Sequence, residues 1–83
     1  MDYIHGKDGV TVNKNMFISK MKLFGDRQED LANALGISLS RLNAKINETD
    51  GAEFTQSEIT AIKFRYHLTA EEVDAIFFAL KVS

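Results

Sequence analysis

The fold is decided by residues 26–47, DRQEDLANALGISLSRLNAKIN, which predict two short helices joined by a tight turn. Asp26 is the expected N-cap of the first helix, because Glu29, three residues later, completes a capping box. Gly36 lies where the chain needs a positive φ, which other residues resist. Ser38 then caps the second helix. A cap, a turn glycine and a second cap in this order predict a helix-turn-helix, with an ordinary helical hairpin as the alternative.

The apolar positions of this stretch fit two helices that share one core. They are Leu31, Ala32 and Leu35 in the first helix and Leu42 and Ile46 in the second. Ala32 is small where the two helices would cross closely, and Ile37 is expected to turn back into the core. The first helix spans about nine residues and the turn about three, which are the proportions of a helix-turn-helix.

The same stretch resembles the helix-turn-helix of lambda-repressor-like proteins, the Cro/CI type of phage regulators. The matching positions are Gln28, Ala32, Gly36, Ile37, Leu42 and Asn47. With its flanking helices the resemblance covers about residues 16–80, but its specific part is residues 28–47. Lys45 departs from the pattern, because many members carry an apolar residue there, and Ile46 is expected to take over the packing. The resemblance implies an all-α, five-helix DNA-binding domain.

Further helices are expected on both sides of the motif. One runs from Asn13 or Lys14 to Phe24 and ends at Gly25, and one or two of its outward lysines can touch phosphate. Two more begin at the capping boxes Thr55/Glu58 and Thr69/Glu72, the first ending near residue 66 and the second near residue 80. The apolar positions of these three helices are Phe17, Met21 and Phe24; Ile59, Ile62, Phe64 and Tyr66; and Val73, Ile76, Phe77 and Leu80.

Residues 1–12 are expected to be a short N-terminal arm or hairpin, and residues 13–83 the DNA-binding domain. Tyr3-Ile4 and residues 10–12 are β-prone and flank a Gly-Lys-Asp-Gly turn, which favours a hairpin. An isolated hairpin is only marginally stable in water, so a frayed arm is the alternative. Such an arm could reach along DNA.

Length and composition exclude several classes of protein. Eighty-three residues build one domain, and the absence of cysteine excludes disulfides and thiolate metal sites. No apolar run approaches the ~20 residues of a membrane span, and no signal peptide is visible, so a cytoplasmic protein is expected. His5 and His67 lack ligand-like spacing, and no catalytic constellation emerges. We therefore expect no enzyme activity, metal, cofactor, membrane partner or small-molecule ligand.

The net charge of −2 argues against nucleic-acid binding, but the charges are unevenly distributed. Residues 13–47 carry six Lys or Arg and three acids, a balance of +3. Residues 48–83 carry three Lys or Arg and seven acids, a balance of −4. The local potential, not the total charge, attracts phosphates. The distribution predicts weak non-specific binding with a strong dependence on salt.

In this motif the second helix enters the major groove of double-stranded DNA. The residues expected to contact bases are Leu39, Ser40, Arg41, Asn43 and Ala44. Asn43 can bond bidentately to adenine, and Arg41 can bond to guanine or to phosphate. Those expected to contact phosphates are Arg27, Gln28, Lys45 and Asn47. The start of the first helix favours an anion, and the resemblance implies the roles of Gln28 and Asn47. Solvated surface is the alternative for each of them.

The last helix is expected to contribute to a homodimer interface made by Val73, Phe77 and Phe78. Phe78 lies off the predicted apolar face, where a domain this small does not fully cover a large aromatic side chain. The alternative is that Phe78 packs against the first helix or the N-terminal arm.

The expected function is sequence-specific DNA binding by a transcriptional regulator that reads a two-fold-symmetric operator as a homodimer. By resemblance this would be a phage or prophage Cro-like repressor. A second hypothesis is a helix-turn-helix fold that binds protein, as an antirepressor or an assembly adaptor. The acidic total and the aromatic last helix favour that reading, whereas the polar outward positions of the second motif helix oppose it.

Overall fold

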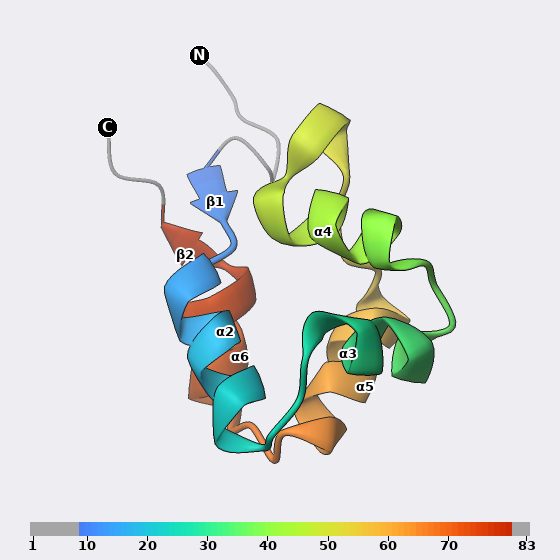
Figure 1. Ribbon diagram of the computed structural model, residues 1–83. Coiled ribbons are helices and arrows are strands. Elements are labelled where there is room, and N and C mark those ends of the chain that lie inside the picture. The colour runs from blue at the N-terminus through green and yellow to red at the C-terminus, as the bar shows by residue number, and fades with distance from the viewer. Residues whose placement is uncertain (1–8, 81–83) are drawn as a thin grey trace.

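The computed structural model of the chain describes residues 9–80, which form five α-helices, one 3-10 turn and two short strands (Figure 1). The helices are α2 (Lys14–Leu23), α3 (Gln28–Leu35), α4 (Leu39–Asn47), α5 (Gln56–Arg65) and α6 (Ala70–Phe77). The 3-10 turn η1 covers Thr49–Gly51, and the strands are β1 (Val10–Thr11) and β2 (Ala79–Leu80). The expectation of an all-α, five-helix domain is confirmed.

Most helix starts follow the capping signals of the sequence. The hydroxyl of Thr55 accepts from the backbone N–H of Glu58, whose carboxylate accepts in return from the N–H of Thr55. The same reciprocal pair joins Thr69 and Glu72 at the start of α6. Ser38 caps α4 as expected. Each such cap satisfies backbone donors that a helix start leaves without partners.

The start of α3 corrects the prediction that Asp26 is its N-cap. The cap is Arg27, whose backbone N–H donates to Asp30 at 2.8 Å. The Asp26 carboxylate instead accepts two bonds from the guanidinium of Arg65, at 2.6 and 2.9 Å, and one from the Tyr66 hydroxyl at 2.6 Å. Charge-assisted, bidentate bonds of this kind are stronger than a bond to a neutral backbone amide, so the distant partners hold the side chain.

The core lies where α2, α5 and α6 meet the inner faces of α3 and α4. Its buried apolar residues are Phe17, Met21, Leu31, Ala32, Leu42, Ile46, Ile59, Ile62, Tyr66, Leu68, Ile76 and Phe77. Phe17, Phe54 and Phe77 form a cluster of edge-to-face rings whose centroids lie 5.3–5.6 Å apart. Such pairs each contribute roughly 0.5–1.5 kcal/mol beyond the burial of their area. The cluster therefore ties α2, α6 and the loop before α5 together.

Three predicted core positions are wrong. Phe64 is 73% exposed, because α5 turns Ile59, Ile62 and Tyr66 inward and leaves Phe64 on the outer side. Leu80 is 79% exposed, because α6 ends at Phe77 and the chain continues as a strand. Phe24 is also exposed, although its ring lies against those of Tyr66 and His67, with centroids 5.5 and 5.7 Å apart.

The two strands join the two ends of the described chain. β1 and β2 pair antiparallel, with Val10 opposite Leu80 and Thr11 opposite Ala79. Val12 packs against the core, and the N–H of Asn13 donates to the carbonyl of Ile76 at 2.7 Å. Residues 10–12 therefore belong to the domain, not to a separate arm. The predicted hairpin partner, Tyr3-Ile4, lies outside the described residues.

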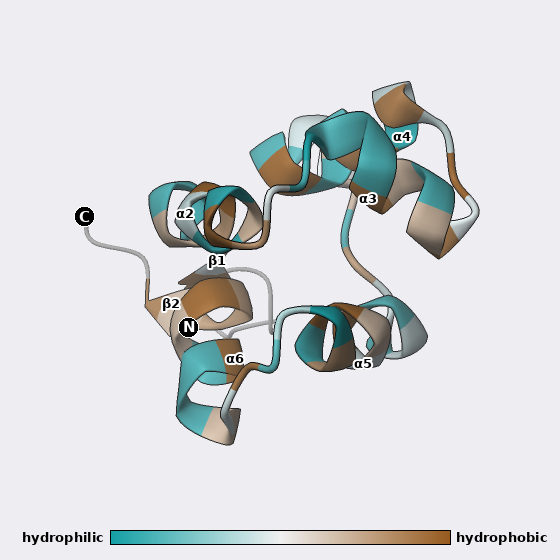
Figure 2. Cartoon of the chain, turned by 60° about the horizontal axis from the view of Figure 1, so that its bottom comes forward, coloured by the Kyte–Doolittle hydropathy of each residue, from teal (hydrophilic) through white to brown (hydrophobic). Residues whose placement is uncertain are grey.

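Each helix carries apolar and polar residues side by side, as the hydropathy colouring in Figure 2 shows. The apolar residues that are buried supply the core described above, and the polar ones remain at the surface. Within residues 9–80, no helix is long and apolar enough to cross a membrane.

Candidate nucleic-acid interface

The helix-turn-helix consists of α3, a three-residue turn that begins at Gly36, and α4. Gly36 ends α3 in the left-handed conformation, with φ of 72°. The N–H of Ile37 then donates to the carbonyl of Ala32 at 3.0 Å, and the Ile37 side chain packs against the core as predicted. Leu31, Ala32, Leu42 and Ile46 are all buried, so both helices are fixed by their inner faces. α4 lies at the periphery of the molecule (Figure 1).

The outer face of α4 presents a polar surface. Ser40, Arg41 and Asn43 are exposed, and their side chains form no hydrogen bond or ion pair with any other residue in the range 9–80. Leu39 is exposed beside them, whereas Ala44 is half-buried. Four of the five predicted base-contacting residues are therefore accessible on one short helix. Hydroxyl, guanidinium and amide groups in this arrangement can bond to base edges.

Lys45 is not on this face, which corrects its prediction as a phosphate contact. The residue is only 4% exposed, and its Nζ lies 2.7 and 3.0 Å from the two carboxylate oxygens of Glu58. A buried ammonium must be paired, and Glu58 in the first turn of α5 supplies the partner. Lys45 thus fills a core-side position that could hold an apolar residue. The sequence predicted Glu58 only as part of the capping box that begins α5, and not as the partner of Lys45.

The contact with Lys45 changes the pKa of Glu58. Burial raises its pKa, but the hydrogen bonds from Lys45 and from Thr55 outweigh burial, so the pKa lies below its ordinary value. The carboxylate therefore stays ionised at neutral pH and remains an ion-pair partner for Lys45.

The C-terminal end of α4 lies beside Lys14, one of the outward lysines of the first helix, of which one or two were expected to touch phosphate. Lys14, at the start of α2, donates from Nζ to Oδ1 of Asn47 at 2.8 Å. The Asn47 amide nitrogen donates to the carbonyl of Asn43 at 2.9 Å. Both ends of the Asn47 amide are therefore engaged by the protein, and the exposed ammonium of Lys14 lies beside it. Its place among the outward lysines of the first helix was its only signal in the sequence.

The N-terminal end of α3 borders a hollow of about 270 Å³. Lys22, Arg27 and Gln28 contribute to its lining, together with Ile18, Met21 and Asp26. The Arg27 guanidinium is exposed and forms two long ion pairs, with Glu29 at 3.7 Å and with Asp30 at 3.8 Å. Within the described range the Gln28 side chain has no hydrogen-bond partner. Cations, a free amide and the positive end of a helix dipole suit an anion here.

Asp26 holds this end of α3 in place through α5. The hydrogen bond from Arg65 lowers the pKa of Asp26 most, and the hydrogen bond from Tyr66 lowers it further, against an opposing effect of burial. Burial and the Asp26 carboxylate both raise the pKa of Tyr66. The loop between α2 and α3 is therefore fixed by an ionised carboxylate and a neutral phenol.

The structure reduces the positive charge that faces solvent. Three of the six cations in residues 13–47 form ion pairs with carboxylates, namely Lys20 with Glu72 at 2.6 Å, Lys45 with Glu58 at 2.7 Å and, at the longer distances of 3.7 and 3.8 Å, Arg27 with Glu29 and Asp30. The other three, Lys14, Lys22 and Arg41, have no carboxylate partner within residues 9–80. Lys14 and Arg27 lie at the two ends of the helix-turn-helix, and Arg41 lies on its outer face.

The predicted dimer residues divide into two kinds. Phe77 is buried in the aromatic cluster, which corrects its assignment to an interface. Val73 is half-buried and packs against the core. Phe78 is the C-cap of α6 and is 44% exposed. α6 ends at Phe77, which is buried together with Ile76, whereas the C-cap Phe78 faces outward.

The described residues include no group of three or more His, Asp or Glu placed to hold a metal ion. Comparisons with protein-family models, with curated proteins and with solved structures find no match for the chain. Any functional assignment therefore rests on the residues and the geometry of the molecule itself.

Proposed function

We propose that the protein is a sequence-specific, double-stranded-DNA-binding transcriptional regulator. The observation that carries the proposal is the outer face of α4, where Ser40, Arg41 and Asn43 are exposed and unpaired within residues 9–80. They project from a helix whose inner face is buried in a helix-turn-helix. A short helix held in this way can enter the major groove and place polar side chains against base edges.

Phosphate contacts would hold the DNA at both ends of the motif. Arg27 and Gln28 at the start of α3 would meet one phosphate, where the helix dipole also attracts an anion. Lys14, held beside Asn47 at the end of α4, would meet another. Such contacts position the protein without reading sequence, whereas Arg41 and Asn43 would supply the specificity. Leu39 can pack against a thymine methyl.

The remaining parts of the proposal extend this DNA-reading role. The resemblance of residues 28–47 to Cro/CI-type phage regulators favours repression through occupation of a promoter in the cytoplasm. A homodimer would place two copies of α4 one helical turn apart on a symmetric operator. The exposed Phe78 supports a role for the end of α6 in that dimer. No catalytic activity is part of the proposal.

A second candidate is a protein-binding adaptor or antirepressor with the same fold. It is favoured by large apolar side chains that remain exposed, among them Leu23, Phe64, Phe78 and Leu80. Exposed apolar surface is typical of protein interaction sites when it forms a contiguous patch. The polar outer face of α4 is the observation against it, because a partner-binding α4 would present more apolar surface than Leu39 alone.

Selection from a random duplex library at moderate salt tests the proposal. Enrichment of a symmetric site with one-turn half-site spacing is the expected result. The matched control is Asn43→Ala combined with Arg41→Ala, which should keep the fold, because both side chains are exposed, and should lose the enriched sequence. A single asymmetric half-site would retain DNA reading and remove the dimer. No enrichment from folded protein would refute DNA reading and favour the adaptor.

A further inference from the structure

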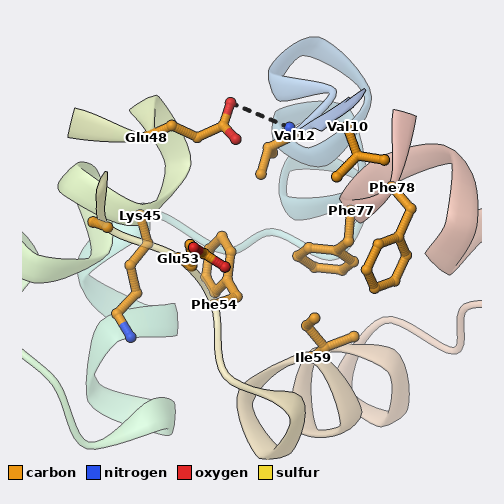
Figure 3. A pocket seen from close by; sticks show the side chains of 10 residues that line it. Val10, Val12, Lys45, Glu48, Glu53, Phe54, Ile59, Phe77 and Phe78 are labelled. Carbon is orange, nitrogen blue, oxygen red and sulfur yellow. Dashed lines mark hydrogen bonds between the residues drawn. The ribbon is translucent and has the colours of Figure 1, made fainter. Parts of the chain in front are cut away.

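A second hollow of about 270 Å³ lies away from the outer face of α4, between β1, the loop before α5, and α6. Its apolar walls are Val10, Val12, Phe54, Ile59, Phe77 and Phe78 (Figure 3). These residues come from four separate parts of the chain, so the hollow exists only in the folded protein. An engineered cavity of about 150 Å³ accepts benzene, so this hollow has room for a molecule somewhat larger than one ring.

Aromatic rings make the walls of this hollow firm. Phe54 and Phe77 lie edge to face, with centroids 5.3 Å apart, and Phe77 is also held by Phe17. Phe78 is 44% exposed, and its ring lies beside that of Phe77 at the edge of the hollow (Figure 3). A site with fixed aromatic walls does not have to rearrange to receive an apolar ligand, which lowers the cost of binding.

Three charged side chains line the hollow, Lys45, Glu48 and Glu53, and two of the three are carboxylates, which favours a cationic ligand. Lys45 contributes its aliphatic stem, and its ammonium turns away from the phenylalanine rings to Glu58. Glu48 accepts from the hydroxyl of Thr11 and from the N–H of Val12, at 3.4 Å for the amide. Both donors are neutral, so within residues 9–80 no cation is paired with the Glu48 carboxylate at the edge of the apolar hollow.

We infer that this hollow binds a small amphiphilic amine, with its apolar body among Phe54, Phe77 and Phe78 and its ammonium beside Glu48. Apolar walls supply the affinity, and the Glu48 carboxylate, whose donors within residues 9–80 are neutral, supplies the preference for a cation. The sequence predicted no small-molecule ligand, because these walls come together only when four separate parts of the chain fold against one another. The inference does not rest on DNA binding.

The test uses three probes of one shape, 4-phenylbutylamine, 4-phenylbutanol and 4-phenylbutyrate, titrated into the full chain without DNA. Amide chemical shifts in two-dimensional NMR report both the affinity and the location. We expect the amine to bind with a Kd on the order of 1 mM or tighter, as suits a ligand of this size. The shifts should centre on residues 10–12, 48–54 and 77–78. The carboxylate probe should bind roughly tenfold more weakly than the amine.

Two variants test separately the apolar contacts of the ligand and the role of the Glu48 charge. Ala52→Phe adds a ring to the lining of the hollow and should abolish binding of all three probes. Its control, Ala61→Phe, adds the same ring to an exposed site on α5 and should change nothing. Glu48→Gln removes the charge while keeping an acceptor for Thr11. It should weaken the amine roughly fivefold and leave the alcohol unchanged.

Several outcomes would overturn the inference. Shifts that do not saturate, or that map to the outer face of α4, would remove the site. Equal affinity for amine, alcohol and carboxylate would remove the assignment to an amine. If Ala52→Phe fails to fold, the shift map and Glu48→Gln still decide the matter. Because no DNA is present, a negative result here leaves the proposed DNA reading untouched, and the reverse also holds.

Discussion

Lys45 Nζ lies 2.7 Å from Glu58 Oε1, and this ion pair joins the inner side of α4 to the first turn of α5. The same Oε1 accepts from the N–H of Thr55, so one carboxylate both caps α5 and pairs with α4. The side chains of the pair are 5% and 13% exposed, which shields it from salt. The position of the proposed groove-reading helix therefore depends on the start of the next helix.

Replacing Lys45 by Met should lower the free energy of unfolding by about 2–4 kcal/mol, because Glu58 is left buried without its cation. Urea denaturation at pH 7 measures the loss. The double variant Lys45→Met with Glu58→Gln should recover part of it, since Gln keeps the cap and carries no charge. A Lys45→Met protein as stable as the wild type would show that the pair contributes nothing.

Lys14→Met should reduce the slope of log K against log salt concentration for DNA binding by about 0.9, the effect of losing one phosphate contact. Lys20→Met is the matched control on the same helix. The Lys20 ammonium already lies 2.6 Å from Glu72, so its loss should change the slope much less. Fluorescence anisotropy over a salt series measures both slopes. Equal changes in the two variants would contradict the placement of DNA beside Lys14.

The stability of the domain should fall in acid as Asp26 takes up a proton. Arg65 and Tyr66 hold the pKa of Asp26 below its ordinary value, so the unfolded chain binds this proton more readily than the folded one. The stabilisation is therefore complete above the unfolded pKa of about 4 and is lost as pH falls through the lower folded pKa.

The variant Asp26→Asn isolates this effect. It should be less stable than the wild type at pH 7, and the difference should shrink as pH falls below about 4. Urea denaturation between pH 2 and about pH 7 follows both proteins, with Asp74→Asn as an exposed control. A difference that stays constant across this range would mean that the Asp26 charge does not stabilise the fold.

Phe77 and Phe78 are neighbours in sequence, but substitution of Phe77 should affect stability and substitution of Phe78 should affect dimer formation. Phe77→Ala should cost about 3–5 kcal/mol of stability, because it empties the aromatic cluster. Phe78→Glu should leave the fold intact and lower the sedimentation mass to that of a monomer. An unchanged mass for Phe78→Glu at DNA-binding concentrations would remove the end of α6 from the proposed dimer.

Sequence predicted the elements that local signals determine. The two capping boxes, the Ser38 cap and the left-handed Gly36 each act over a few residues, and all lie where expected. The end of α6 was predicted too late, because the helix is ended by the pairing of residues 79–80 with β1 rather than by a local breaker.

The polar contacts between distant parts of the chain could not be predicted. Lys45 and Glu58 are 13 residues apart, and Asp26 and Arg65 are 39 apart. The hydrophobic periodicity of a helix does not indicate which distant polar residues will pair. Both contacts changed a residue's assigned role, from phosphate contact to buried ion pair and from cap to loop anchor. The accessible positions on α4 were easier to predict, because burial of Leu42 and Ile46 fixes which side faces solvent.

The β1–β2 ladder also determines how the domain would respond to mechanical force. Val10 pairs with Leu80, so the two ends of the described chain leave the ladder side by side. Tension applied through residues 10 and 80 would break the ladder bonds one after another, as in unzipping, instead of loading them together in shear. The helices would then be peeled from both ends of the chain. The domain should therefore yield at low force, however stable it is to heat or urea.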